Sequence, residues 1–292
     1  IKLHVYYSHM DWYRPDYPLG DTSKALPQPE GSADWNSYFN FMNAQLTEIL
    51  TNYGKIGAIW FDGMWDHPKD FDWQLDEQYA LIHKLQPACL IGNNHHMAPH
   101  DGEDFQLFEQ DLPGENSAGF SAGQEVSDML PLESCQTMNN TWGYNITDKS
   151  YKSADELIRR LVKSAGMNSN LLLNIGPRPD GQLPDEAMAR LQEIGKWTKR
   201  YGETIYGTRG GLIKPQPWGV TTQKGNTLYV HILDLKEKSL TIPLSTKKIK
   251  SARMYDDGSK LKLLKHGNDS TVINLPEVPQ SVDTIVEIML KK

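Results

Sequence analysis

Short apolar runs recur along the first two-thirds of the chain, and the clearest of them covers residues 55–63. This run is long enough for a strand and too short for a typical helix, and its apolar residues do not alternate with polar ones. A strand buried on both faces has this pattern, which is typical of a parallel sheet covered by helices. Further strands are predicted over residues 1–8, 88–93, 104–110 and 170–177.

Segments with apolar residues at helical spacing lie between these strands. Residues 35–52 and 75–85 form two of them. Another starts at a capping box, in which Ser153 and Glu156 satisfy the free backbone amides of a helix start, and it ends at Gly166. A further helix is predicted from an apolar face made by Met188, Leu191, Ile194 and Trp197.

The alternation of strands and helices over residues 1–207 predicts βαβ units and a (β/α)₈-like catalytic barrel. The pattern accounts for about five or six strands, whereas a closed barrel of this kind has eight. The chain also opens in mid-strand at Ile1. We therefore expect the N-terminal strands of the barrel to be absent from this chain.

The pattern changes near Gly210, where apolar and polar residues begin to alternate. Such alternation is typical of antiparallel strands with one buried face. Hairpin turns are expected at residues 257–258 and 267–268, and residues 284–290 predict a last strand. Residues 208–292 are therefore predicted to form a C-terminal antiparallel β-sandwich.

The composition is that of an ordinary globular protein, with 292 residues, 38% hydrophobic and 23% charged residues and a formal net charge of -7. This charge argues against a nucleic-acid partner, because phosphate binding needs clustered Lys and Arg. No apolar run approaches the roughly 18 residues that a membrane span needs. The two cysteines, Cys89 and Cys135, are expected to be buried free thiols, which excludes a disulfide scaffold and a zinc ribbon.

Asp62 is the clearest candidate for chemistry, because it ends the strand predicted over residues 55–63. Catalytic groups of parallel α/β barrels lie at the C-terminal ends of strands. Trp60 and Trp65 flank Asp62, and aromatic rings stack on the C–H face of sugars. A carboxylate in this setting suits a sugar site, where it would attack the anomeric carbon. The alternative is an Asp that only caps a turn between strand and loop.

A retaining glycosidase needs a second carboxyl group about 5 Å from the nucleophile, to serve as the acid/base. Glu109 is the preferred candidate, because it lies where a predicted strand meets a loop. Glu115 lies on that loop and is the first alternative, and Glu133 begins the next strand. Burial and the nearby charge of Asp62 would raise the pKa of such a carboxyl group and keep it protonated near neutral pH.

The pair His95 and His96 is followed by several carboxylates, which suggests a metal site. Adjacent side chains on a strand, however, point to opposite faces, so these two histidines would rarely share one ion. We therefore predict no metal site. A histidine that hydrogen-bonds sugar hydroxyls, or that fills a polar loop, is the preferred interpretation.

Aromatic residues supply further candidates for the site. Trp65 and Trp142 are predicted stacking platforms, with packing in the core as the alternative. Tyr6 and Tyr7 end the first predicted strand. Because neighbouring side chains on a strand point to opposite faces, one of these two should point into the barrel and hydrogen-bond the nucleophile.

Five segments of the chain are individually weak signals and together form a specific combination. They are residues 6–12, 60–63, 142–144, 170–181 and 199–207. In this combination the chain resembles the α-L-fucosidases of glycoside hydrolase family 29, and most of all those of gut Bacteroidetes, over nearly its whole length. The resemblance implies a (β/α)₈-like barrel, a C-terminal β-sandwich and retaining hydrolysis of terminal α-L-fucose without a metal or other cofactor.

The resemblance also implies roles for single residues. Asp62 matches the nucleophile, and Glu109 resembles the acid/base, although loop positions around it differ within the family. Trp142 resembles the aromatic residue that packs by the fucose methyl group, and Tyr7 resembles the strand-end tyrosine. Family members commonly carry an Arg near positions 95–96, so we expect a His to replace it here.

These observations predict an exo-acting, retaining α-L-fucosidase that acts on fucosylated oligosaccharides or glycoconjugates, in the periplasm or outside the cell. The first alternative is a retaining glycosidase for another sugar, such as a galactoside. An apolar pocket around Trp142 and Trp65 favours fucose, which has a C6 methyl group where galactose has CH₂OH. The second alternative is a non-catalytic sugar-binding barrel, against which Asp62 and the several candidate acids argue.

Overall fold

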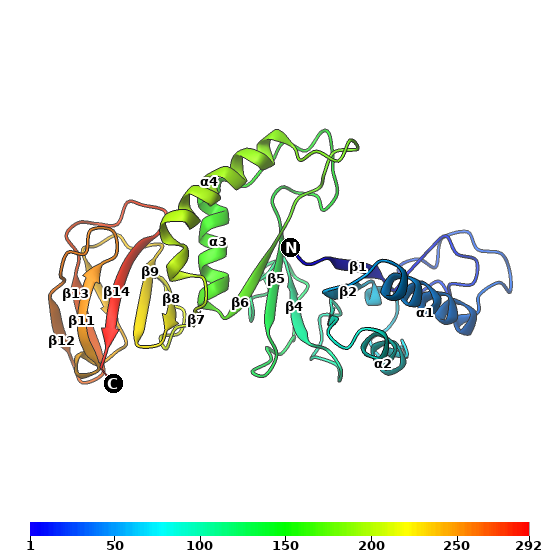
Figure 1. Cartoon of the computed structure of the whole chain (residues 1–292), viewed down its shortest axis with the longest axis horizontal. Helices are drawn as coiled ribbons and strands as arrows, with labels where there is room; N and C mark the ends of the chain where they lie inside the picture. The colour runs from blue at the N-terminus through cyan, green and yellow to red at the C-terminus, as the bar shows by residue number, and fades with distance from the viewer. Residues whose placement is uncertain (292) are drawn as a thin grey trace. The chain divides into compact units, whose positions relative to one another are not determined.

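The computed structural model describes residues 1–291 of the chain (Figure 1). Contacts within the chain divide it into two compact units, Ile1–Glu133 and a second unit that begins at Ser134. Within the described residues, every helix is too short or too polar to span a membrane. Cys89 and Cys135 are both buried and are not joined in a disulfide, as predicted.

The first unit contains a parallel sheet whose strands follow one another in chain order. Its strands are β1 (His4–Ser8), β2 (Ala58–Asp62), β3 (Leu90–Asn93), β4 (Phe105–Glu109) and the start of β5 (Leu132–Thr137). The register pairs Ser8 with Asp62, and Phe61 with Asn93. The C-terminal ends of these strands therefore share one edge of the sheet, which is the edge that carries the active site in parallel α/β barrels.

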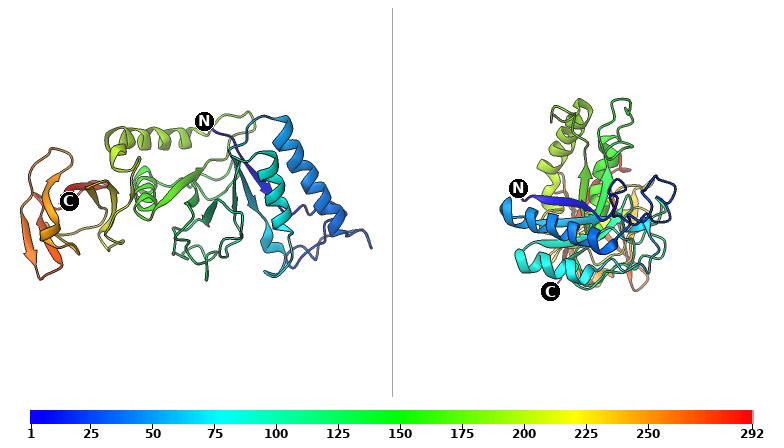
Figure 2. Two further views of the ribbon diagram at one scale, coloured as in Figure 1. Left: turned by 60° about the horizontal axis from the view of Figure 1, so that its bottom comes forward. Right: turned by 90° about the vertical axis from the view of Figure 1, so that its right-hand side faces the viewer.

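Helices α1 (Trp35–Asn52) and α2 (Leu75–Leu85) have the predicted bounds and pack on the same face of this sheet (Figures 1 and 2). The carboxylate of Asp34 caps α1 by accepting a hydrogen bond from the backbone N–H of Ser37. Helices and strands share a core that includes Tyr38, Met42, Leu46, Ile59, Phe61, Tyr79, Ile82 and Ile91. Because side chains alternate along a strand, Trp60 and Asp62 lie on the face opposite to these helices.

The second unit continues the alternation of strands and helices beyond β5. Its next elements are α3 (Ala154–Gly166), β6 (Ser169–Asn174), α4 (Asp185–Tyr201) and the 3₁₀ helix η2 (Gly202–Thr204). The predicted capping box is confirmed, because the Ser153 hydroxyl accepts from Glu156 N–H and the Glu156 carboxylate accepts from Ser153 N–H. The predicted inward position of Met188 is wrong, since its side chain is exposed and the neighbouring Ala187 is buried with Trp197.

Two antiparallel sheets follow, with the strand orders β11-β14-β9-β8-β7 and β10-β13-β12. Their elements are β7 (Arg209–Gly210), β8 (Gly219–Lys224), β9 (Thr227–Ile232), β10 (Ser239–Ile242), η3 (Thr246–Lys248), β11 (Ile249–Met254), β12 (Leu263–His266), β13 (Ser270–Asn274) and β14 (Thr284–Leu290). Apolar residues of both sheets form one core, which includes Leu228, Val230, Leu240, Ile242, Ile273, Val286 and Ile288. This arrangement is a sandwich, as the alternating pattern predicted.

The structure therefore has a parallel sheet with helices, followed by antiparallel sheets. Strands β1 to β6 supply six of the eight strands of the predicted barrel, so the described residues do not close a complete one. The antiparallel strands begin at Arg209, beside the end of the predicted barrel segment 1–207. The division between the compact units lies elsewhere, within β5.

A buried polar network joins the sandwich to the turn that follows α4. His231 Nδ1 lies 2.8 Å from Asp283 Oδ2, and both side chains are fully buried. His231 Nε2 lies 3.1 Å from the hydroxyl of Thr222, which donates a 2.5 Å hydrogen bond to the carbonyl of Thr204 in η2. Each buried polar group in this network has its neighbour as hydrogen-bond partner. Removing one side chain should therefore leave another without a partner and lower the stability of the fold.

We expect His231→Ala to lower the free energy of unfolding by about 3 kcal/mol, because it leaves the Asp283 carboxylate buried without a partner. Urea unfolding of wild type and variant measures this change. Lys236→Ala, which removes an exposed side chain whose partner Asp234 is also exposed, is the control and should change the stability little. A His231→Ala variant as stable as the wild type would contradict the prediction.

Candidate active site

Asp62 lies at the end of β2, where the chain turns into the 3₁₀ helix η1 (Met64–Asp66). Gly63 makes this turn with φ of 96°, a left-handed conformation that L side chains rarely adopt. A Cβ atom at Gly63 would also come within 3.0 Å of the Met10 side chain. The carbonyl of Asp62 accepts a 2.7 Å hydrogen bond from His9 N–H. The backbone at Asp62 is thus fixed by the hydrogen bond from His9 and by the left-handed turn at Gly63.

Asn94, which directly follows β3, brings the carboxylates of Asp62 and Glu109 together. Its Nδ2 donates a hydrogen bond of 2.7 Å to Glu109 Oε2 and a longer one of 3.4 Å to Asp62 Oδ1. The two oxygens therefore lie no further apart than the sum of these distances. The shared donor thus places the two carboxylates close together, as the two catalytic carboxyl groups of a glycosidase must be.

Glu109 has the electrostatic environment of a proton donor. It ends β4, and its side chain is only 18% exposed. Burial raises the pKa of the Glu109 carboxyl, the hydrogen bond from Asn94 partly opposes this, and the negative charge of Asp62 raises the pKa further. The raised pKa favours the protonated form at higher pH than usual for a Glu, which is what an acid catalyst requires.

Tyr6, and not Tyr7, contacts the candidate nucleophile. The Tyr6 hydroxyl donates a 2.6 Å hydrogen bond to Asp62 Oδ2. The Tyr7 hydroxyl instead donates to Gln45 Oε1 on α1, at 2.8 Å, and the Tyr7 side chain is buried in the helix-covered face. The predicted assignment of Tyr7 to the site is therefore wrong, because the register of β1 turns Tyr6 to the face of Asp62 and Tyr7 to the opposite face.

The two adjacent histidines face different surroundings, but strand alternation is not the reason: both lie in the loop after β3, where His96 has a left-handed backbone with φ of 58°. His96 Nε2 lies 3.7 Å from Glu109 Oε2, and its ring stacks on Phe120. Burial lowers the pKa of His96, and the negative charge of Asp62 partly opposes this. His96 therefore lies beside the acid/base candidate in a setting that disfavours its own charged form.

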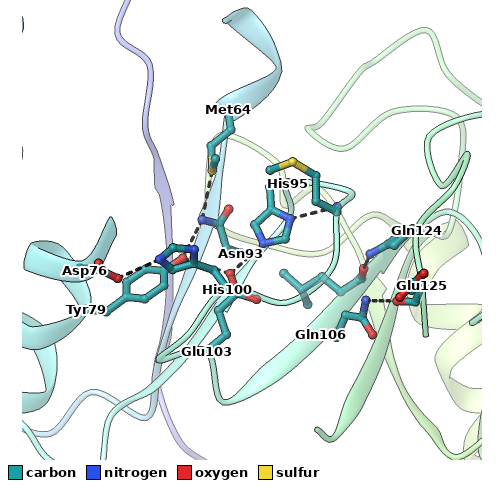
Figure 3. A network of polar contacts seen from close by, with 12 residues as sticks. Met64, Asp76, Tyr79, Asn93, His95, His100, Glu103, Gln106, Gln124 and Glu125 are labelled. Carbon is teal, nitrogen blue, oxygen red and sulfur yellow. Dashed lines mark hydrogen bonds and ion pairs between the residues drawn. The ribbon is translucent and has the colours of Figure 1, made fainter. Parts of the chain in front are cut away.

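His95 contacts the carboxylate of Glu103, in the network drawn in Figure 3. Its Nε2 lies 2.8 Å from Glu103 Oε1, and its Nδ1 accepts a hydrogen bond from Met97 N–H. The hydroxyl of Tyr79, on α2, also donates to Glu103. The predicted sugar contact of His95 is therefore wrong, because its side chain is buried on the helix side, where it holds the loop that presents Asn94.

The two alternative acids have other partners. Glu133 accepts a 3.0 Å hydrogen bond from the indole Nε1–H of Trp60, and burial raises the pKa of its carboxyl. Glu115 accepts a long hydrogen bond of 3.4 Å from the backbone N–H of Leu112. Glu109 is favoured over both, because it shares the amide of Asn94 with Asp62.

The predicted stacking platforms remain predictions. Trp65 lies in η1 and is 48% exposed, with its ring edge against the ring of Trp12 at 5.9 Å between centroids. Trp142 belongs to the second unit and is 41% exposed. Exposure leaves both rings free to contact a ligand, which is a requirement for stacking and not a proof of it.

Sequence reasoning missed Asn94 and did not choose Tyr6. Asn94 carried a usable signal, since it is a polar residue at the end of the strand between those of Asp62 and Glu109. The sequence contains no comparable signal for Tyr6, because the choice of Tyr6 depends on how β1 pairs with β2. Among residues 1–291, no group of three or more His, Cys, Asp or Glu side chains has a geometry that could hold a metal ion.

Comparison with known proteins gives a consistent result. Residues 1–203 match the model of the family described as Alpha-L-fucosidase. The structure of α-L-fucosidase isoenzyme 1 from Paenibacillus thiaminolyticus is similar, with 33% identity and a TM-score of 0.79, over 98% of this chain and 71% of that one. An α-L-fucosidase structure from Bacteroides thetaiotaomicron has a TM-score of 0.79 at 23% identity, over 100% of this chain and 68% of that one.

Human tissue α-L-fucosidase is 26% identical over 309 residues, which cover 96% of this chain and 59% of the human protein. The chain thus spans about three-fifths of the length of the curated relatives that it matches. The family match extends over well more than half of the chain, and it agrees with the 33% identity to the Paenibacillus protein. This chain belongs to the α-L-fucosidase family.

Proposed function

We propose that the full-length protein is a retaining exo-α-L-fucosidase, with Asp62 as the nucleophile and Glu109 as the acid/base. The observation that carries this proposal is the side-chain amide of Asn94, which hydrogen-bonds both carboxylates. It holds them close together, as attack by one and proton transfer by the other at the same glycosidic bond require. The raised pKa of Glu109 and the hydrogen bond from Tyr6 to Asp62 support the assignment of proton donor and anionic nucleophile.

In the first step an oxygen of the Asp62 carboxylate attacks the anomeric carbon of fucose. The bond from this carbon to the glycosidic oxygen breaks, and Glu109 transfers its proton to the departing oxygen. In the second step a water molecule attacks the anomeric carbon of the fucosyl-enzyme. Glu109 accepts a proton from the water while the ester bond to Asp62 breaks, which releases fucose with retained configuration.

Two relatives support this mechanism and the substrate class. The Bacteroides structure is described as a trapped covalent intermediate obtained with 2-fluoro-fucosyl fluoride. A related bacterial fucosidase structure contains a methylpyrrolidine inhibitor. We infer for this protein a complete (β/α)₈-like barrel, fucosylated oligosaccharides or glycoconjugates as substrates, and a periplasmic or extracellular location.

The proposed function is tested by comparing the hydrolysis of an aryl α-L-fucoside and an aryl β-D-galactoside by the full-length protein. We expect turnover of the fucoside with kcat/KM at least about tenfold higher, because a single changed group in a pocket already costs roughly 1–3 kcal/mol and these two glycosides differ in ring and anomeric configuration as well as at C6. Faster turnover of the galactoside would identify a glycosidase for another sugar. Binding of fucose without turnover of any glycoside would identify a sugar-binding barrel.

Replacing Asn94 by Ala should shift the pH profile of kcat/KM. Its basic limb, where activity falls as pH rises, should move to higher pH. Glu109 must be protonated in the free enzyme, so activity falls as pH rises through the pKa of Glu109. The Asn94 hydrogen bond lowers this pKa, and its loss raises it. We also expect the maximal kcat/KM to fall about tenfold, since a hydrogen bond to a charged group contributes roughly 1.5–3 kcal/mol.

The matched control for this profile is Asn93→Ser. The Asn93 amide faces α2, where it donates to the Tyr79 hydroxyl at 2.9 Å (Figure 3). Loss of the Asn93 amide should leave the basic limb of the pH profile at the wild-type pH. A basic limb of Asn94→Ala that stays at the wild-type pH, or moves to lower pH, would contradict the proposed coupling between Asn94 and Glu109.

A further inference from the structure

We propose that Glu133 is a positioning residue for the nucleophile: it holds Trp60, Trp60 supports Tyr6, and Tyr6 holds Asp62. The inference rests on the proposed function and extends it to a carboxyl group that the mechanism leaves without a role. All four residues belong to the first compact unit. They come from three strands, since Tyr6 lies on β1, Trp60 and Asp62 on β2, and Glu133 on β5.

The first contact of this chain joins Glu133 to Trp60. The Trp60 indole Nε1–H donates to Glu133 Oε1 at 3.0 Å. The carboxyl group is largely buried, which raises its pKa, and the hydrogen bond from Trp60 opposes this. A buried indole N–H usually finds a partner, so the loss of its acceptor would drive Trp60 toward another ring position.

The second contact joins Trp60 to Tyr6. The two residues face each other across the β1–β2 pair, in the same register position. Their rings stack with centroids 5.6 Å apart and planes inclined by 26°. Because Tyr6 rests on this ring, the position of its hydroxyl depends on the orientation that Glu133 gives to Trp60.

The third contact reaches the reacting group. The Tyr6 hydroxyl donates a 2.6 Å hydrogen bond to Asp62 Oδ2, which sets the orientation of the carboxylate. A nucleophile displaced by about 1 Å loses about two orders of magnitude in rate. Glu133 thus acts on Asp62 through two aromatic rings. Glu109, in contrast, shares the amide of Asn94 with Asp62 directly.

The test compares Glu133→Gln with Glu133→Leu in the full-length protein. Gln keeps an oxygen that accepts from Trp60 and cannot act as an acid or base, whereas Leu fills the space without an acceptor. We expect kcat/KM of Glu133→Gln to stay within about threefold of the wild type and that of Glu133→Leu to fall at least about tenfold. The loss should be equal for phenyl and 2,4-dinitrophenyl α-L-fucosides, and azide should not restore it.

Trp60→Phe tests the same contact without changing Glu133. It keeps a six-membered ring for Tyr6 to stack on and removes the five-membered ring that carries the N–H, so kcat/KM should fall at least as much as in Glu133→Leu. In a Tyr6→Phe background, Glu133→Leu should have a much smaller effect than in the wild type, since its route to Asp62 is already broken. Tyr7→Phe, whose hydroxyl contacts Gln45, is the matched background in which the effect should persist.

Several results would overturn the inference. One is a kcat/KM equal to that of the wild type in both Glu133→Leu and Trp60→Phe, when thermal unfolding shows that both variants are folded. Another is a loss in Glu133→Gln as large as in Glu133→Leu, with azide rescue and a strong dependence on the leaving group, because this would make Glu133 the acid/base. A wild-type protein that cleaves no fucoside would overturn the proposed function itself, and the positioning role with it.

Discussion

Replacement of Asp62 by Asn is expected to lower kcat for an aryl α-L-fucoside by at least about three orders of magnitude. The amide oxygen of Asn has nearly the shape of the carboxylate and can still accept from Asn94, but it cannot form the ester bond to the anomeric carbon. The contacts of Asp62 with Tyr6 and Asn94 place this group at the centre of the site. Initial rates with a sensitive fluorogenic fucoside measure the loss.

The matched control is Asp70→Asn, which changes an exposed Asp of the loop after the same strand and should keep wild-type kinetics. Thermal unfolding of both variants checks that the fold is retained. In Asp62→Gly, azide should restore turnover and give β-L-fucosyl azide, because it replaces the carboxylate in a single inversion. Near-normal turnover by Asp62→Asn would exclude Asp62 as the nucleophile.

Replacement of Glu109 by Ala is expected to lower kcat/KM for phenyl α-L-fucoside by about 10²–10⁴-fold, the usual contribution of general acid catalysis. For 2,4-dinitrophenyl α-L-fucoside the loss should be small, because this leaving group departs without a proton. Water then attacks the fucosyl-enzyme slowly, for lack of a general base. Azide needs no general base, so it should speed up this second step and give α-L-fucosyl azide through two inversions.

Glu115→Ala is the control for this prediction, since Glu115 lies on the loop after the same strand and was the first alternative. It should keep a wild-type dependence on the leaving group and show no effect of azide. If azide rescues Glu115→Ala and not Glu109→Ala, the acid/base is the loop residue. The stereochemistry of the two azide products, α for Glu109→Ala and β for Asp62→Gly, separates the two catalytic roles.

Much of the fold followed from the sequence because it depends on local patterns. The apolar spacing of residues 35–52 and 75–85 predicted α1 and α2 with their observed bounds. The capping box at Ser153 marked the start of α3, and strict alternation after Gly210 marked the antiparallel sheets. Each of these signals lies within a few residues of the element that it specifies, so no long-range contact is needed to interpret it.

The sequence by itself determined the strand-end carboxylates, because a strand followed by a polar residue is a local signal, and it pointed to the family through several short segments. Only the tertiary structure decided that Tyr6 rather than Tyr7 contacts Asp62, and that Asn94 joins Asp62 to Glu109. These facts depend on strand register and on distances between residues remote in sequence. The raised pKa of Glu109 also depends on the tertiary structure. Its carboxyl group is buried and lies near the charge of Asp62 only once the strands pack side by side.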